Sequence, residues 1–430
     1  MKVIIVGAGI GGLTAGIALR WKGHDVEIFE RSSLLREIGA AINVCPNASQ
    51  ILLKWGFDFK RSRMVSARTH MKASGQTLEI EGSVTYPDFT PIYGGPWLQA
   101  HRLDLHNELR RVATDTEGPG KPVEVTLRAQ VVDYDMENGS ITLADDTTHS
   151  ADLIIGADGV HGSAVRHVLG HPIPSVATGW AVFRWLTPTD TLTGDTEIAP
   201  LLEGPLSVGD GVSRFLATDE DMRRIVWYPC ADNTIQNFVA VHRDRRSDDE
   251  REDWDRSASV EDVISHYTDF HPNIIKILRK ATSIKRWPLL YREPIKTLSK
   301  GRLVLIGDAA HPMLPHQGQG GAQAIEDGAA LGEIFTDIGD KPSLDEVRER
   351  LRLFEKVRLR RVSAMQVLSD AGQDRVFEVR ERAKQYMPLG VEVPSTMKEF
   401  RDHNFGYDVL EDSRRALREY LDARGQSCYA

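Results

Sequence analysis

The chain has 430 residues, of which 41% are hydrophobic and 27% are charged, and its formal net charge is −9 at pH 7. This composition is typical of an ordinary globular protein, long enough for one large domain or for two cooperating domains. The negative charge argues against nucleic acid as the main partner, because phosphate binding favours a basic face, and it leaves a small anionic substrate open.

The first fifty residues predict a strand, a glycine turn, a helix and a second strand. The β-branched run KVIIV (2–6) is typical of a buried strand, GAGIGG (7–12) breaks it, and the next residues up to Gly23 have helical spacing. The run DVEIFE (25–30) predicts the second strand, and a further helix is expected at 46–55. The opening segment is therefore predicted to be one βαβ unit.

The glycine loop of this unit has the spacing of a dinucleotide-binding turn. We expect Gly7 to allow the tight turn, Gly9 to let the backbone approach a pyrophosphate, and Gly12 to let the helix meet the sheet. The N-terminus of the helix attracts negative charge. Glu30 ends the second strand, where an acid can accept both ribose hydroxyls. An acid at this position excludes a 2′-phosphate, so the predicted ligand is FAD or NAD and not NADP.

The hydrophobic pattern of the sequence changes twice in the middle of the chain. Helical periodicity returns at 101–113, and alternating runs from 123 to 155 surround a turn at 137–140, which predicts a hairpin that leads into a last strand. Residues 175–245 are rich in β-formers and predict an antiparallel sheet. The mixed-charge stretch 243–256 is interpreted as a solvated loop and helix entry, not a binding patch.

After this sheet, residues 301–311 restore the α/β pattern, and 343–386 is helical and heavily charged. The predicted fold class is α/β, with a Rossmann-like cofactor domain, an inserted antiparallel β-sheet substrate domain and C-terminal helices. The expected boundaries are 1–60, 101–174 and 296–340 for the discontinuous cofactor domain, 61–100 and 175–295 for the substrate domain, and 341–430 for the helical region.

In two later segments, an aspartate and one or more glycines come directly after a predicted strand. LIIGADGVHGSAVR (153–166) places Asp158 and Gly159 after an apolar run, although an Asp-Gly pair by itself is also typical of a plain turn. GRLVLIGDAAHPMLPHQGQGG (301–321) places Asp308 and several glycines after another such run.

Together with the first glycine loop, these segments resemble the three motifs of the single-component FAD-dependent aromatic hydroxylases, the para-hydroxybenzoate and salicylate hydroxylase type. The similarity covers nearly the whole chain, most strongly up to about residue 335. The stretches ERSSLLREIGAAINVCPNA (30–48) and WLQAHRLDLHNEL (97–109) are most similar to the salicylate hydroxylase branch, which includes fungal enzymes.

The resemblance implies that the bound dinucleotide is FAD. Asp308 would contact the ribityl chain near the pyrophosphate, and the glycine stretch that ends at Gly321 would run under the flavin ring into a helix. Asp158 belongs to the second motif of the site. Arg102 would lie beside the FAD phosphates, with a solvated arginine as the alternative, and Ala41 would bring backbone close to the flavin.

Substrate contacts are expected from the β-rich insertion. Arg184 and Tyr228 match positions that hold a substrate phenolate in the fungal members, and a purely structural role stays open for both. An arginine beside a phenol favours the ionised oxygen, which makes the ring more nucleophilic, and a tyrosine can fix the orientation of that oxygen. His316, next to Pro315, would lie above the flavin ring, either as a proton carrier or as a turn-stabilising residue.

Other positions are less directly tied to chemistry. Arg31 would face adenine or solvent, and Arg36 would be exposed. The tryptophans Trp97, Trp185 and Trp227 are expected to pack in the protein instead of stacking on a ligand.

The function implied by the resemblance is that of an FAD-dependent monooxygenase. It would use NADH or NADPH and O2 to hydroxylate a phenolic or other hydroxylated aromatic substrate, salicylate-like or polyketide-derived, through a flavin C4a-hydroperoxide. The nicotinamide would dock transiently, because the sequence has no second strand-GxGxxG-helix unit for it. No metal is expected, and a homodimer is left open.

Two alternatives remain from the sequence. One is another FAD-dependent oxidoreductase, such as an epoxidase or an oxidase; a halogenase is disfavoured because its GWxWxIP-type motif is not evident. The other is a non-catalytic, dinucleotide-sensing protein.

The cysteines and the apolar runs bear on the compartment. Cys45, Cys230 and Cys428 are widely spaced and form no CxxC pair, so neither a disulfide framework nor a zinc site is predicted. A reducing, cytoplasmic location is the simpler expectation. No apolar run approaches the roughly 18 to 20 residues that span a bilayer.

Overall fold

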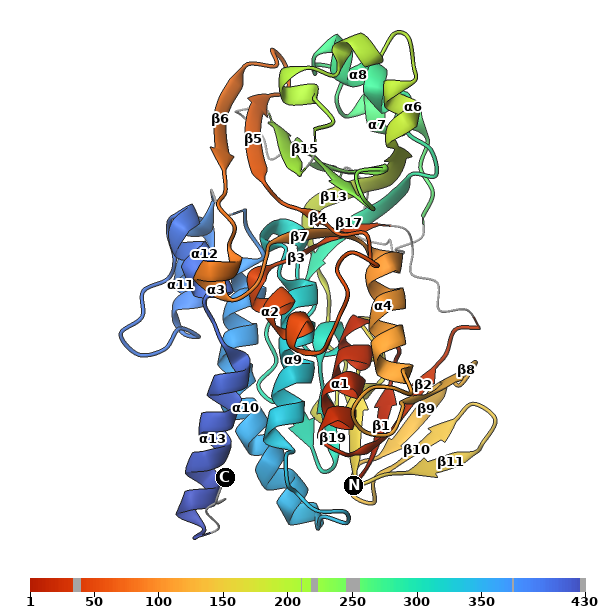
Figure 1. The fold of residues 1–430 in the computed structure, drawn as a ribbon, viewed down its shortest axis with the longest axis vertical. Helices are drawn as coiled ribbons and strands as arrows, with labels where there is room; N and C mark the ends of the chain where they lie inside the picture. The colour runs from red at the N-terminus through yellow and green to blue at the C-terminus, as the bar shows by residue number, and fades with distance from the viewer. Residues whose placement is uncertain (34–39, 210, 218–222, 245–255, 373–374, 426–430) are drawn as a thin grey trace.

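The computed structural model describes residues 1–33, 40–209, 211–217, 223–244, 256–372 and 375–425. Two large sheets lie towards opposite ends of an elongated molecule, and most of the long helices lie between and beside them (Figure 1). The predicted α/β fold with an inserted sheet and C-terminal helices is confirmed.

The first large sheet contains the predicted βαβ unit. Its strand order is β18-β19-β12-β1-β2-β8, and all neighbouring pairs are parallel except β18 and β19. The central strand is apolar because both of its faces are covered: Val3, Ile4 and Ile5 are fully buried. The strands are β1 (Lys2–Val6), β2 (Asp25–Glu30), β8 (Glu124–Leu127), β12 (Leu153–Gly156), β18 (Ser299–Lys300) and β19 (Leu303–Leu305).

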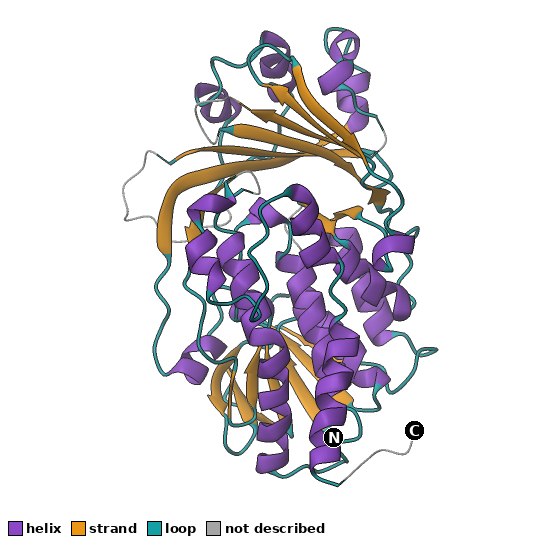
Figure 2. Ribbon diagram, turned by 90° about the vertical axis from the view of Figure 1, so that its left-hand side faces the viewer, coloured by secondary structure: helices purple, strands orange, loops and turns teal. Residues whose placement is uncertain are grey.

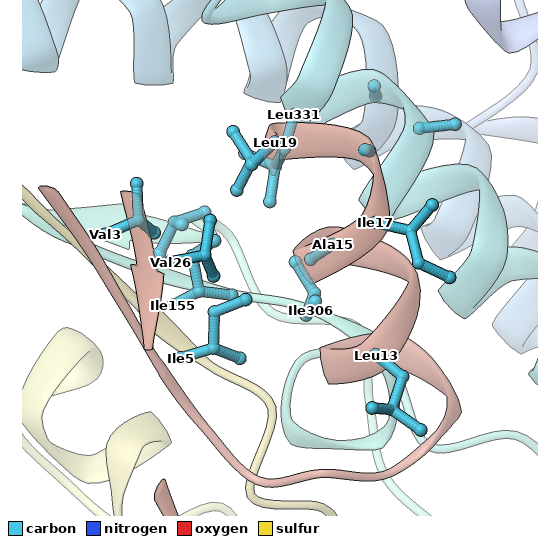
Figure 3. Close-up of a cluster of buried hydrophobic side chains, with 14 of the residues drawn as sticks. Val3, Ile5, Leu13, Ala15, Ile17, Leu19, Val26, Ile155, Ile306 and Leu331 are labelled. Carbon is cyan, nitrogen blue, oxygen red and sulfur yellow. The ribbon is translucent and has the colours of Figure 1, made fainter. Parts of the chain in front are cut away.

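Two helices from distant parts of the chain cover one face of this sheet. Figure 3 shows apolar side chains of β1, β2 and β12 packed with those of α1 (Ile10–Trp21) and with Leu331 of α9 (Gly320–Ile334). This shared core packs α9 against α1. Near the start of α9, a Cβ at Gly11 would lie 3.5 Å from Cβ of Ala324, although more than three hundred residues separate the two positions in the sequence.

The second large sheet has seven strands in the order β17-β13-β16-β15-β14-β5-β6. Its neighbouring strands are antiparallel, as predicted, except that β14 and β5 run parallel. Figure 2 shows it as a layer between small helices at one end and the helical body. The strands are β5 (Thr69–Ser74), β6 (Ile80–Thr85), β13 (Val176–Pro188), β14 (Val212–Ala217), β15 (Arg224–Cys230), β16 (Ile235–Arg243) and β17 (Lys285–Tyr291).

The outer face of this sheet has its own apolar core. Trp185 and Trp227 stack on Phe238 with ring centroids 5.0 and 4.8 Å apart, so both tryptophans pack within the protein, as expected. The opposite face points towards the helical body. The helices near the outer face are α6 (Thr189–Thr193), α7 (Val260–Ser265) and α8 (Pro272–Leu278).

Two small sheets and further helices complete the described fold. The small sheets are β3 (Ala41–Val44), β4 (Val65–Ser66) and β7 (Leu98–His101), and β9 (Val131–Asp135), β10 (Ser140–Leu143) and β11 (Thr148–Ser150). The helices are α2 (Pro46–Lys54), α3 (Thr90–Tyr93), α4 (Arg102–Thr114), α5 (Ala164–Leu169), α10 (Leu344–Leu368), α11 (Arg380–Lys384), α12 (Met397–Phe405) and α13 (Val409–Ala423). None of the helices within the described ranges combines the length and the apolar character needed to cross a membrane. The division into cofactor, substrate and C-terminal regions remains our proposal.

Three histidines should make this fold sensitive to acid. Burial lowers the pKa of His24, His70 and His403 to about 4, whereas an unfolded chain binds these protons near pH 6.5. The folded chain therefore binds fewer protons in the window between these values, and the free energy of unfolding should fall as the pH falls through it, by up to about 1.4 kcal/mol per pKa unit for each histidine. Burial raises the pKa of Asp370 to about 6, and this shift has the opposite effect on the free energy of unfolding. Asp370 is a single group, so the effect of the three histidines is expected to be larger.

The measurement is the thermal unfolding midpoint of the apoprotein between about pH 7.5 and pH 5. We expect the midpoint to stay nearly constant above about pH 7 and to decrease as the pH falls below it. A midpoint that is constant or that increases would contradict the buried, neutral state of these histidines.

Candidate cofactor and substrate site

Three loops leave the same edge of the first large sheet. Because β1, β12 and β19 are parallel neighbours, the loops after their carboxyl ends begin side by side. Gly7 has a φ of 107°, and a Cβ there would lie 2.3 Å from the carbonyl oxygen of Ala157. A Cβ at Gly11 would lie 3.6 Å from Cδ1 of Ile306, in ordinary contact. The segments around 7, 158 and 307 therefore meet.

The start of α1 is shaped for close backbone approach. A Cβ at Gly12 would lie 1.9 Å from the carbonyl oxygen of Gly7, so only glycine lets the helix come this close to the turn. A Cβ at Gly9, by contrast, would meet no atom of the described residues within 4 Å. In the described structure α1 has no side-chain cap and no acid in its first turn, so its first N–H groups stay available to an anion.

A cavity of about 590 Å³ opens in front of the first two loops. Five of the residues predicted to bind the cofactor line it: Gly7, Gly9, Glu30, Arg102 and Asp158. Two further arginines in the lining, Arg31 and Arg166, add positive charge of the kind that suits a diphosphate. Asp308, Ala41 and Gly321 lie outside this lining, and Gly12 lies behind the turn.

The carboxylate of Glu30 is held at the end of its strand by backbone donors. One oxygen accepts a hydrogen bond from the N–H of Ala8 at 2.9 Å, and the other accepts one from the N–H of Ser32 at 2.8 Å. A carboxylate has about four lone-pair sites, so it can accept further hydrogen bonds from ribose hydroxyls.

The carboxylate of Asp158 has a structural contact on one oxygen only. Oδ2 accepts a hydrogen bond from the N–H of Ala164 at 3.0 Å, at the start of α5, and one from the Tyr134 hydroxyl at 3.4 Å. Oδ1 is buried and has no partner among the described residues. Burial raises the pKa of Asp158, and its backbone hydrogen bonds oppose this effect.

Sequence reasoning missed His106, which also lines the cavity. Its Nε2 lies 2.7 Å from the carbonyl oxygen of Ala8 and donates to it, so the histidine supports the glycine loop from α4. The available signal was the spacing to Arg102, because residues four apart share a helix face.

The third loop places Asp308 and Gly321 on another side of the site. Asp308 is exposed in the short 3₁₀ turn Gly307–Ala309, which follows β19. Helix α9 begins at Gly320, and a Cβ at Gly321 would lie 2.7 Å from Cδ1 of Ile42 in β3. The glycine stretch and the strand that carries Ala41 are therefore in contact.

Arg184 reaches from the second large sheet to this strand. Its Nη2 donates to the carbonyl oxygen of Ala41 at 3.1 Å, and its guanidinium lies 4.5 Å from the ring of Trp287. Burial lowers the pKa of Arg184 to about 10; Tyr228 opposes this effect, and the charge of Arg102 adds to it. Within the described part of the chain Arg184 forms no ion pair with a carboxylate.

Tyr228 is 6% exposed and packs with Ala41 and Cys230. Burial raises the pKa of its hydroxyl, and Arg184 opposes this, so the hydroxyl stays a neutral donor. Asn237, which sequence reasoning missed, lies opposite Tyr228 in the sheet, and its Oδ1 accepts from the N–H of Ala41 at 3.1 Å. Asn237 thus holds the N–H of Ala41, and Arg184 holds its carbonyl oxygen.

The remaining predicted positions are placed as follows. His316 Nδ1 lies 2.9 Å from Nη2 of Arg224, so this histidine contacts the second large sheet. Arg31 is exposed at the cavity. Arg36 lies outside the described residues.

These features fit an FAD. The uncapped start of α1 and the arginines suit the pyrophosphate, the open side of Gly9 gives it room, and Glu30 suits the ribose. The loop of Asp308 and the start of α9 continue the site towards β3 and the second large sheet, where Arg184 and Tyr228 lie.

Comparison with known proteins agrees with this geometry. Residues 1–338 match the family described as "FAD binding domain". The chain is 39% identical over 429 residues, 98% of this chain and 96% of the relative, to the FAD-dependent monooxygenase cfoG of Aspergillus candidus. It is 34% identical over 431 residues, 98% and 97% of the two chains, to hispidin-3-hydroxylase of Neonothopanus nambi.

Among solved structures, a salicylate hydroxylase substrate complex has the same fold, with a TM-score of 0.72 at 22% identity over 97% of this chain and 98% of the other. By its family match and its relatives, this chain belongs to the FAD-dependent monooxygenases, in the family that includes the aromatic hydroxylases.

Proposed function

We propose that the protein hydroxylates a phenolic or other hydroxylated aromatic substrate with NAD(P)H and O2. The observation that carries this proposal is the half-buried guanidinium of Arg184, which forms no ion pair with a described carboxylate and lies beside the buried Tyr228. A partly buried charge without a counter-charge loses some of its hydration, so this place favours an anionic ligand.

The two side chains have separate roles in this proposal. Arg184 stabilises the ionised phenol oxygen and so raises the nucleophilicity of the ring, and the neutral Tyr228 hydroxyl donates a hydrogen bond that orients this oxygen. Bound FAD supplies the transfer of reducing equivalents from NAD(P)H and the activation of O2. Residues Gly9, Glu30, Arg102, Asp158 and Asp308 bind and orient that cofactor.

The names of similar proteins support the substrate class. The relative from Neonothopanus nambi is named hispidin-3-hydroxylase, and the structural neighbour is a salicylate hydroxylase in complex with its substrate. A further relative, 31% identical over 399 residues, is named 3-hydroxybenzoate 6-hydroxylase.

The test is a screen of phenolic acids and phenolic aldehydes for stimulated oxidation of NADH or NADPH, coupled to product mass. We expect at least one compound to stimulate oxidation and to gain one oxygen atom. Substrate oxidation without NAD(P)H consumption would instead indicate an oxidase, and bound FAD with no stimulated oxidation by any compound would contradict the proposal.

Asp308→Ala should weaken FAD binding by about tenfold, the size expected for one lost hydrogen bond to a charged group. Asp308 is exposed, so the thermal unfolding midpoint of the apoprotein should stay close to that of the wild type. The FAD Kd is measured by quenching of flavin fluorescence, with Asp308→Asn as the variant that keeps the shape. An unchanged Kd in both variants would remove Asp308 from the cofactor site.

A further inference from the structure

A cluster of buried charges lies directly behind the Gly307–Asp308 turn. Glu326 and Asp327 of α9 and Arg358 of α10 are at most 1% exposed, and Arg361 has a side chain that is 8% exposed. With His311, which is 2% exposed, they form what we call the α9–α10 charge cluster. None of these residues lines the cavity, and the proposed chemistry does not use them.

Asp327 closes the turn with a single carboxylate. Its Oδ2 accepts a hydrogen bond from the backbone N–H of Gly307 at 3.0 Å and one from Nε2 of His311 at 2.6 Å. The N–H of His311 also donates to the carbonyl oxygen of Gly307 at 2.8 Å. Both ends of the segment 307–311 are thereby fixed, and Asp308 lies exposed between them.

Arg358 in turn fixes Asp327. Its Nε donates to Oδ1 of Asp327 at 2.8 Å, its Nη1 donates to Glu326, and its Nη2 donates to Oε1 of Gln323 at 2.8 Å. Gln323 lies in the first turns of α9, the helix whose start carries Gly321. One guanidinium from the C-terminal region therefore holds both the turn and the helix start.

The second carboxylate extends the cluster to α2. Glu326 accepts hydrogen bonds from Arg361 at 2.7 and 2.8 Å and from Nδ2 of Asn47 at 2.6 Å. Asn47 also donates to Oε1 of Gln319, the residue just before α9, at 3.1 Å.

The cluster is compensated in charge. Two carboxylates face two guanidiniums, which is the condition for burying such groups. Burial alone would raise the pKa of Asp327, but His311 and Arg358, with the hydrogen bond from Gly307, hold it at about 2. Arg361 and Arg358 likewise lower the pKa of Glu326 against the effect of burial. Both acids stay ionised near neutral pH, and the contacts persist.

We propose that Asp327 is a positioning residue for the cofactor: with His311 and Arg358 it holds the 307–311 turn in the conformation that presents Asp308 to the ribityl side of FAD. Sites are held in productive geometry by side chains that are themselves locked by packing and hydrogen bonds. The proposal goes beyond the proposed function, because it depends on FAD binding and not on the substrate.

The experiment compares Asp327→Asn with Glu333→Gln. Glu333 is a matched control, since it lies further along the same helix and its carboxylate accepts from Lys22 at 3.0 Å and from Arg414 at 3.1 Å, away from the turn. For each variant we would measure the unfolding midpoint of the apoprotein, the FAD Kd by fluorescence quenching, and the visible circular dichroism of the bound flavin.

We expect Asp327→Asn to raise the FAD Kd by about tenfold or more, from the loss of charge-assisted hydrogen bonds, and to change the dichroism of the bound flavin. Glu333→Gln should lower the unfolding midpoint but change the Kd by less than about twofold. An unchanged Kd in Asp327→Asn, or a Kd that rises in both variants in proportion to the lost stability, would overturn the proposal.

If Asp327→Asn does not fold, two variants of His311 test the proposal instead. His311→Gln keeps a side-chain donor and should retain most of the FAD affinity, whereas His311→Leu should lose it to the same extent as expected for Asp327→Asn. Equal affinity in the two His311 variants would overturn the proposal. All of these titrations omit substrate and NAD(P)H, so their failure would leave the proposed hydroxylation untouched.

Discussion

Replacing Arg184 with alanine should lower kcat/KM for the aromatic substrate by about 100-fold or more, the usual cost of losing a group that stabilises charge at the reacting centre. FAD should stay bound, because Arg184 lies on the second large sheet and does not line the cavity in front of Gly7 and Gly9. The measurements are steady-state kinetics and the flavin content of the purified variant.

The pH profile separates an electrostatic role from a structural one. Arg184 favours the phenolate, so without it the substrate must ionise at its own pKa, and the activity of Arg184→Ala should recover partly as the pH rises. Arg243→Ala is the matched control: its guanidinium lies 4.4 Å from the ring of Trp180 on the same sheet, as that of Arg184 lies 4.5 Å from Trp287. Full turnover in Arg184→Ala, or an equal loss in both variants, would contradict the assignment.

The largest effect on folding is expected from Gly12→Ala. The added Cβ would lie 1.9 Å from the carbonyl oxygen of Gly7, so α1 would have to move away from the turn. We expect the free energy of unfolding to fall by about 3 kcal/mol or more, at the upper end of the usual cost of overpacking, together with loss of FAD binding. Chemical denaturation of the apoprotein measures the first quantity and fluorescence titration the second.

Gly9→Ala makes the complementary test in the same loop. Gly9 has φ −72° and ψ −174°, which alanine adopts, and a Cβ there meets no described atom within 4 Å. The variant should therefore fold with nearly the stability of the wild type but bind FAD more weakly, because the methyl group occupies the side where the pyrophosphate approaches. Wild-type FAD affinity in Gly9→Ala would show that the pyrophosphate does not lie there.

The features that the sequence predicted well are the local ones. Gly7, Gly9 and Gly12 follow a β-branched run at the spacing of a dinucleotide turn, and the strand that ends at Glu30 follows at the expected distance, so the βαβ unit could be read without its surroundings. The meeting of the Gly7 loop with the Asp308 turn was predicted only through resemblance, because no local pattern encodes which strands become neighbours.

The missed features depend on tertiary contacts. Asn237 carries no sign that its amide holds the backbone of Ala41 from another sheet, since strand asparagines have many roles. Asp327 and Arg358 carry no local sequence signal of burial, because their burial depends on the packing of α10 against α9. The parallel pairing of β14 with β5 joins distant segments, so strand patterns alone could not predict its direction.

The central claim is that loops from three remote parts of the chain converge on one flavin. The most direct measurement is a titration of the apoprotein with FAD, followed by flavin fluorescence and visible absorption. The account predicts saturation at one FAD per chain, with tight binding in the wild type and weaker binding in Gly9→Ala and Asp308→Ala. A colourless protein that takes up no FAD would contradict it, and so would an FAD Kd that neither substitution changes.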